Sequence, residues 1–283
     1  MAWRKLGKKQ REDNDYWNEV WQHIEEVITR QEVDHVIEAT LAEIDQVIGK
    51  QDVAYGWSGG KDSQALRVVM DLYGIQNCVM GMSADMEYPQ FLRWVTDHMP
   101  WELEIVDNPE LTLAWLGQNE DLLFPQDSVT ASKWFKHIQH RAQRNYFEKH
   151  KLNTIILGRR RGDSNYLGKD GLYTNKAGIT RYSPIRDWSH EQVMGACYYH
   201  GYDLPPTYDW PNGWVVGTGA WPARQWVDTV TQGWYETYLI DPTIVERAAE
   251  HINSAAVFLK ELDEGNVRVI RLYRFQDRCW VSN

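Results

Sequence analysis

The sequence predicts an α/β fold built on a doubly wound, mainly parallel sheet of five strands. Three observations support this prediction. Short apolar runs alternate with amphipathic stretches between residues 53 and 157, the connections between them are only a few residues long, and one glycine-rich turn separates an apolar run from a helix. Alternating strands and helices give right-handed crossovers, which place parallel strands in one sheet with helices on both of its faces.

Two amphipathic helices are expected before the first strand. Apolar residues recur at helical spacing from 16 to 28 and again from 33 to 48, and Gly49 ends the second pattern. The pattern leaves open whether these helices cover the sheet or form a contact with a second copy or a partner protein. We therefore expect residues 1–50 to form an N-terminal helical segment.

Residues 51–203 are predicted to form a nucleotide-binding α/β domain. Strands are expected at residues 53–57, 77–83, 103–106 and 154–157. Helices are expected at 64–73, 89–98 and 131–149, and at 190–200 after a Ser189 cap, whereas 158–182 has the composition of loops. A Rossmann-like sheet of this kind binds ligands at the carboxyl ends of its strands, where the crossover direction reverses.

The last part of the chain is predicted to be an extension packed on this domain. Residues 204–222 are rich in proline and glycine, which indicates irregular structure, and 227–274 is consistent with two helices. Many of the fifteen tryptophans lie in this C-terminal region, 204–283. They are not interleaved with Lys and Arg, which favours packing of a loop-rich region over stacking on nucleobases.

The turn between the first strand and its helix has the sequence SGGKDS. Adjacent glycines allow successive N–H groups to point inward, and the helix N-terminus adds the positive end of its dipole, so the turn predicts a phosphate site. Its lysine adds a mobile cation, and its hydroxyls can donate to phosphate oxygens. A Walker A loop is excluded by the spacing; the alternative is an ordinary capped turn. The predicted phosphate ligands are Ser58, Gly59, Gly60, Lys61, Asp62 and Ser63.

Polar residues follow two further predicted strands. Asp85 follows the second strand, where a carboxylate can hold a ribose hydroxyl or, with Asp62, a Mg²⁺ ion; the alternative is that it caps the next helix. Gly158 follows the fourth strand and is itself followed by Arg159, Arg160 and Arg161. Arginines crowded at one strand end indicate a shared anion, and a solvated surface cluster is the alternative.

Composition restricts the partners. The formal net charge is −10 and the sequence pI is about 5.4, which argues against a nucleic-acid backbone or an anionic membrane as partner. The three cysteines are widely spaced and odd in number, which indicates free thiols in a reducing compartment. With neither an apolar signal core nor a run of membrane-spanning length, the sequence predicts a soluble cytoplasmic protein.

Taken together, these motifs resemble the phosphoadenosine phosphosulfate (PAPS) reductase family of the PP-loop ATP pyrophosphatase superfamily, whose fold is termed adenine nucleotide alpha hydrolase-like. The resemblance spans residues 52–210, and SGGKDS matches the PP-loop at every defined position. It implies an adenine nucleotide across the strand ends, with phosphates on residues 58–63 and further anionic groups near Arg159 and Arg160. The other matching segments are Tyr88-Pro89, Gly158-Arg159-Arg160 with Asp163-Ser164, and residues 184–193 with 204–208.

The chain departs from that family near its C-terminus. The reductases carry a cysteine in a Glu-Cys-Gly-Leu-His setting, whereas Cys279 is followed by Trp280 and lacks the rest. Three scattered cysteines, Cys78, Cys197 and Cys279, cannot supply four ligands, so no iron–sulfur cluster is expected.

Three hypotheses for function follow. The leading one is an ATP pyrophosphatase or adenylyltransferase type of enzyme, which uses ATP and Mg²⁺, cleaves at the α-phosphorus and adenylates an unknown small-molecule or macromolecular acceptor. Its expected catalytic residues are Lys61, Asp62, Arg159 and Arg160. The second is a sulfonucleotide reductase that uses Cys279 and a thioredoxin-type reductant. The third is a non-catalytic module that binds or senses adenine nucleotide together with a partner protein.

Overall fold

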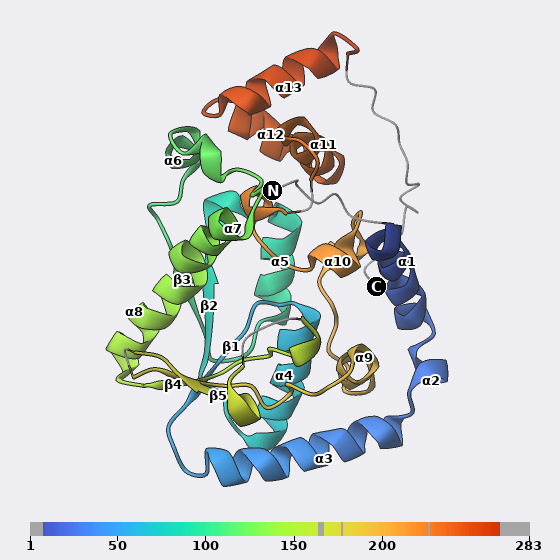
Figure 1. The fold of residues 1–283 in the computed structure, drawn as a ribbon, viewed down its shortest axis with the longest axis vertical. Helices are drawn as coiled ribbons and strands as arrows, with labels where there is room; N and C mark the ends of the chain where they lie inside the picture. The colour runs from blue at the N-terminus through green and yellow to red at the C-terminus, as the bar shows by residue number, and fades with distance from the viewer. Residues whose placement is uncertain (1–7, 164–166, 177, 226, 267–283) are drawn as a thin grey trace.

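The computed structural model describes residues 8–163, 167–176, 178–225 and 227–266 (Figure 1). Its centre is a six-stranded sheet with the order β3-β2-β1-β4-β6-β5. All neighbours pair in parallel except β5 and β6, which pair antiparallel at one edge. The strands are β1 (Ala54–Gly56), β2 (Cys78–Met82), β3 (Leu103–Asp107), β4 (Thr154–Ile156), β5 (Leu172–Thr174) and β6 (Thr180–Tyr182).

The mainly parallel α/β sheet predicted from the sequence is confirmed, but its strand count is corrected from five to six. Strands β1 to β4 lie at the four positions named above, and the other two form the hairpin of β5 and β6, in a segment that the sequence assigned to loops. Each of these strands has three residues, too few to produce an alternating apolar pattern, and all of β5 is exposed. The hairpin therefore could not be predicted from the periodicity of apolar residues.

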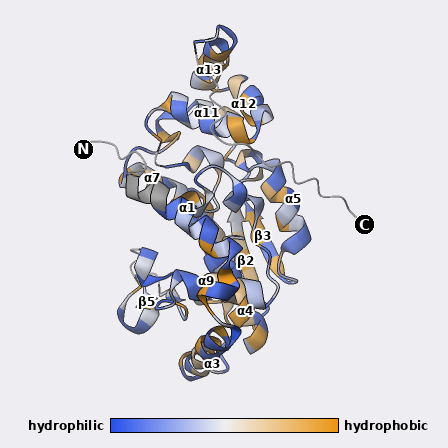
Figure 2. Cartoon of the chain, turned by 90° about the vertical axis from the view of Figure 1, so that its right-hand side faces the viewer, coloured by the Kyte–Doolittle hydropathy of each residue, from blue (hydrophilic) through white to orange (hydrophobic). Residues whose placement is uncertain are grey.

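The two faces of the sheet are covered by different helices. Val79 and Ile155 cluster with side chains of α8 (Arg141–His150). Because successive strand residues point to opposite faces, their neighbours Met80 and Ile156 join the larger core. That core includes α4 (Lys61–Tyr73) and α9 (His190–Tyr199), which pack together. This is the doubly wound arrangement, and Figure 2 shows hydrophobic residues concentrated along the sheet and α4.

The helices that connect the strands follow the predicted order. Helix α5 (Pro89–His98) begins with proline at its first position, where the missing N–H costs no hydrogen bond. The predicted helix at 131–149 is interrupted: α7 (Ser128–Phe135) continues through a π-helical turn at Lys136–His140 into α8. The short α6 (Leu113–Gly117) follows β3.

The N-terminal residues form three helices where two were predicted: α1 (Lys8–Gln22), α2 (Ile24–Val27) and α3 (Arg30–Val47). Helix α3 begins with a capping box between Thr29 and Glu32 and packs against α4 and α9. Helix α1 packs against α10 (Gly213–Val216). Both N-terminal contacts are thus with helices of the same chain.

The C-terminal residues form three helices, one more than predicted: α11 (Val230–Ile240), α12 (Pro242–Ala249) and α13 (Asn253–Asp263). They lie at the end of the molecule opposite α3 (Figure 1). Trp221 and Trp234 pack with Phe124 beneath them, and both tryptophans belong to the same continuous core as the sheet. Within the described residues, no helix is long and apolar enough to cross a membrane.

Candidate functional site

The glycine-rich turn joins β1 to α4, and its residue identities set its shape. Gly59 has a φ of +73°, and a Cβ atom there would lie 2.8 Å from the Trp94 ring. The Ser63 hydroxyl donates to the Gly60 carbonyl at 2.8 Å and accepts a hydrogen bond from the Ser58 N–H at 3.1 Å. The Ser63 hydroxyl, expected to bind phosphate, thus holds the turn closed from within.

Backbone donors at this turn are left free. The N–H groups of Gly59, Gly60, Asp62 and Ser63 make no hydrogen bond with another described residue. The N–H of Lys61 donates to the Tyr208 hydroxyl at 2.8 Å. Unpaired N–H groups at a helix N-terminus attract anions, because the partial positive charges of the donors and of the helix dipole point the same way.

The Asp62 carboxylate is held by two cations. Lys61 Nζ lies 2.6 Å from Oδ2, and Arg160 Nε lies 2.7 Å from Oδ1. Burial alone would raise the pKa of the Asp62 carboxyl, but the charges of Lys61 and Arg160 outweigh it and lower that pKa below its ordinary value. Lys61, expected as a mobile cation, is buried in this ion pair.

Arg160 is the hub of the network. Arg160 as a whole is only 1 % exposed. Its guanidinium also donates to Asp163 Oδ1 at 2.9 Å and to His190 Nε2 at 3.0 Å. Since a guanidinium can only donate, the His190 Nε2 atom accepts and the proton of the neutral ring lies on Nδ1. Burial and the charges of Lys61 and Arg160 lower the pKa of His190 to about 4, so the ring is neutral at pH 7. Trp17 of α1 stacks on this ring, with centroids 4.4 Å apart.

Gly158 allows β4 to approach the start of α4. A Cβ atom on Gly158 would lie 2.6 Å from the carbonyl oxygen of Asp62, closer than real Cβ contacts allow. The approach occurs where β1 has β2 on one side and β4 on the other, which is the reversal point of the sheet. Gly158 therefore has a steric role beside the turn.

The three arginines predicted to share an anion point in different directions. Arg160 is buried against Asp62, and Arg161 pairs with Asp187 at 2.7 Å on the surface. Arg159 lines the cavity above the turn and has no ion pair or hydrogen bond with a described residue. Burial and the nearby charge of Arg181 lower the pKa of Arg159. Arg159 is the member of the trio that an incoming anion can reach.

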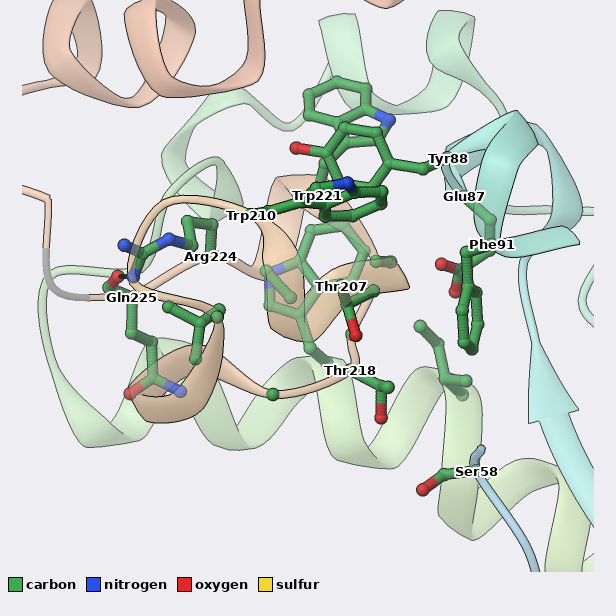
Figure 3. Close-up of a pocket in the computed structure, with 18 of the residues that line it drawn as sticks. Ser58, Glu87, Tyr88, Phe91, Thr207, Trp210, Thr218, Trp221, Arg224 and Gln225 are labelled. Atoms are coloured by element: carbon green, nitrogen blue, oxygen red, sulfur yellow. Dashed lines mark hydrogen bonds between the residues drawn. The ribbon is translucent and has the colours of Figure 1, made fainter. Parts of the chain in front are cut away.

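Two cavities meet at the turn. One of about 730 Å³ lies over the turn and is lined by Lys61, Arg159, His190 and Trp17. The other, of about 240 Å³, has mainly apolar walls that include several aromatic rings and is called the aromatic cavity below (Figure 3). Residues that line both cavities include Ser58, Gly81, Gly217 and Thr218, and the aromatic walls of the smaller one are Tyr88, Phe91, Trp134, Phe135, Trp210 and Trp221.

Asp85 lies outside both cavities. Its carboxylate accepts a hydrogen bond from the Leu113 N–H at 3.0 Å and pairs with Arg247 at 2.6 Å, beside a separate, smaller cavity. The structure therefore does not bring Asp85 together with Asp62. Asp85 instead bonds the first N–H group of α6 and Arg247. No group of three or more His, Cys, Asp or Glu residues within the described ranges could hold a metal ion.

Two of the three thiols lie in the core. Cys78 and Cys197 are buried, and burial raises the pKa of both. Neither is an exposed thiolate that could attack a substrate. Cys279 lies outside the described residues, so its role stays a prediction.

Comparison with known proteins gives distant structural similarity only. No family model matches the chain, and no curated protein does. The PAPS reductase from Candida auris in complex with phosphate is 12 % identical, with a TM-score of 0.46 over 64 % of this chain and 92 % of that one. Yeast FAD synthetase in complex with FAD is 12 % identical, with a TM-score of 0.42 over 67 % of each chain. The U34-tRNA thiolase NcsA from Methanococcus maripaludis, with its 4Fe-4S cluster, is 13 % identical, with a TM-score of 0.42 over 83 % of this chain and 81 % of that one.

Several residues at the site were not singled out from the sequence. Tyr208 entered only through a matched segment, and Trp17 was one of many apolar residues on a helical face. Arg181 of β6 adds charge beside Arg159, but it comes from the strand that the sequence did not reveal. Only the Tyr208 segment carried a signal, because prolines before an aromatic residue indicate a fixed turn.

Proposed function

We propose that this chain binds ATP and transfers its adenylyl group to an acceptor, with pyrophosphate as the leaving group. The observation that carries the proposal is the set of four unpaired N–H groups at the start of α4, beside Lys61. Gly60, Asp62 and Ser63 line the cavity that contains cationic side chains. The aromatic cavity adjoins it at Ser58. A nucleotide has the same division between an anionic end and a flat, largely apolar base.

The cavities suggest how the nucleotide would lie. Stacking surfaces favour the base in the aromatic cavity, and the free N–H groups favour the terminal phosphates at the turn. The α-phosphorus would then lie between them, near Ser58 and Thr218, which line both cavities. An acceptor would approach through the larger cavity, where Arg159 is available for its negative charge or for a phosphate oxygen.

The chemistry is a displacement at the α-phosphorus. A bond forms from the acceptor oxygen to this phosphorus while the bond to the bridging oxygen of the β-phosphate breaks. The leaving pyrophosphate gains negative charge, which the N–H groups and Lys61 stabilise. Asp62 and Arg160 act as positioning residues, since they fix the place of Lys61. Both oxygens of Asp62 are already engaged, so the Mg²⁺ that accompanies ATP is treated as part of the substrate.

The test uses two ATP analogues together with a small-molecule extract as the source of acceptor. Pyrophosphate should form from ATP and imidodiphosphate from β,γ-imido-ATP, each together with the adenylylated acceptor, whereas α,β-methylene-ATP should give neither, because its α–β link cannot be cleaved by this reaction. Lys61→Ala should reduce the rate at least about 100-fold, because an interaction made mainly in the transition state is lost. Lys260→Ala, at an exposed site in α13, is the matched control.

Products would separate the alternatives. ADP and phosphate as products would contradict attack at the α-phosphorus. Sulfite release from PAPS would instead indicate a reductase, and its loss in Cys279→Ser would assign the thiol. Tight binding of ATP without any product, even with the extract present, would favour a binding module.

A further inference from the structure

One carboxyl group in the aromatic cavity, that of Glu87, has no ion-pair partner among the described residues. Glu87 follows the short helix Ala84–Met86, is 7 % exposed, and lines this cavity. Its Oε2 atom is buried and has no hydrogen-bond partner among the described residues. Thr207 Oγ1, another buried atom without such a partner, lines the same cavity, and Figure 3 shows both side chains at the pocket. Buried polar atoms are nearly always paired, so two orphans in one cavity indicate a missing ligand.

The surroundings of Glu87 decide its charge state. The other ionisable groups that line the cavity are Tyr88, Arg224 and Glu236. Arg224 is already paired with Glu236 at 2.7 Å, and burial raises the pKa of Tyr88, which stays neutral. No cation in the described part of the chain forms an ion pair with Glu87, and its burial raises its pKa to about 8. The carboxyl group is therefore protonated at neutral pH.

A protonated carboxyl group offers a donor and an acceptor side by side. Adenine presents the complementary pair, a ring nitrogen that accepts next to an amino group that donates. Guanine offers the same pattern through O6 and N1–H, and it alone also offers two adjacent donors, N1–H and the 2-amino group, which match the two acceptor oxygens of an ionised carboxylate. A protonated carboxyl group beside the base can therefore pair with adenine, whereas an ionised one cannot form that pair and favours guanine.

We infer that Glu87 is the residue that binds the edge of the adenine base through its protonated carboxyl group, with Thr207 as a second polar contact. This inference rests on the proposed function, because it requires the base of the nucleotide to occupy the aromatic cavity. It assigns Glu87 a base-binding role that is separate from the phosphate-binding turn.

The test is calorimetric binding of β,γ-imido-ATP and β,γ-imido-GTP at pH 7 and pH 9.5. The wild type should bind the adenine analogue at pH 7 and lose about 10-fold or more of that affinity at pH 9.5, because Glu87 ionises, so the ratio of adenine to guanine affinity should fall as the pH rises. Glu87→Gln keeps a donor and an acceptor but cannot ionise, so it should bind well at pH 7 and lose less at pH 9.5. Comparing the two proteins cancels the effects of pH that do not come from Glu87. Glu87→Leu should bind the adenine analogue about 10- to 100-fold more weakly.

The outcomes separate this inference from the proposed function. If the wild type binds the adenine analogue but Glu87→Gln shows the same pH dependence, or Glu87→Leu binds that analogue as tightly as the wild type, Glu87 does not contact the base while ATP binding stands. If the wild type binds neither analogue, the proposed function fails and the inference with it. Denaturant unfolding at pH 9.5 checks the burial of Glu87 independently: Glu87→Gln should be more stable than the wild type there, and equal stability would contradict the account.

Discussion

Arg160 lies 98 residues after Asp62 in the sequence, yet its Nε atom lies 2.7 Å from the Asp62 Oδ1 atom. The bond ties the segment after β4 to the first turn of α4. Arg160 also bonds Asp163 and His190. One buried guanidinium therefore holds Asp62, Asp163 and His190 in fixed positions relative to each other. Breaking this hub should affect the fold as well as the site.

Arg160→Ala should lower the free energy of unfolding by about 3–5 kcal/mol, because it leaves buried acceptors without their cation. Denaturant unfolding followed by circular dichroism measures the change. Arg161→Ala is the matched control, since its pair with Asp187 is exposed and contributes about 0–1 kcal/mol. Equal effects of the two substitutions would show that Arg160 is not a hub.

Gly158→Ala should cost about 2–4 kcal/mol of stability, because the added Cβ atom would meet the carbonyl oxygen of Asp62 at 2.6 Å. The strand and the helix must separate to accept it, so nucleotide affinity should fall as well. Gly162→Ala is the control, since a Cβ atom there meets nothing within 4 Å. Thermal unfolding and nucleotide titration of both proteins check the prediction, and an unchanged Gly158→Ala protein would disprove the close approach.

Tyr208→Phe should destabilise the protein by about 1–3 kcal/mol, because the buried Lys61 N–H loses its acceptor. Tyr238→Phe is the comparison, since the Tyr238 hydroxyl makes no hydrogen bond with a described residue and its ring packs against Phe258. Chemical denaturation distinguishes them. A loss in Tyr238→Phe as large as that in Tyr208→Phe would mean that the hydroxyl of Tyr208 has no special role.

Stability should fall as the pH is lowered from about 6.5 to 4, in part because of His190. In this window the unfolded chain binds a proton on His190 while the folded protein does not, so protons favour unfolding by up to about 3 kcal/mol. Unfolding at pH 7 and pH 4.5 should show a smaller difference in His190→Gln than in the wild type. The exposed His23 provides the control substitution, His23→Gln, which should leave the difference unchanged.

The sequence predicted the parts of the fold that depend on local patterns. The parallel sheet was recognised because its strands alternate with amphipathic helices, and the Ser189 cap was recognised from the residue type at the start of α9. The hairpin of β5 and β6 escaped because three-residue strands carry no periodicity. The helices of the C-terminal region were undercounted because Pro242 begins α12 only two residues after α11 ends.

The candidate site was harder to predict than the fold, because partner choice depends on the tertiary structure. The three adjacent arginines are indistinguishable in the sequence but have three different environments in the structure. Of the three, only Arg159 faces the cavity without a partner among the described residues. Asp62 and Asp85 each follow a parallel strand, but Asp62 lies in the first turn of α4, whereas Asp85 pairs with Arg247 of α12. The residues near Asp85 in the sequence give no indication of a partner 162 residues away.

The position of α1 determines when the larger cavity can be completed during synthesis of the chain. Trp17 rests on His190, and the Trp214 N–H donates to Asn14, 200 residues earlier in the chain. The ribosome therefore releases α1 long before the surface on which it docks exists. The wall that α1 contributes to the larger cavity can form only after residue 214 has left the exit tunnel, so a nascent chain gains the complete pocket only once about 200 residues separate α1 from the exit of the tunnel.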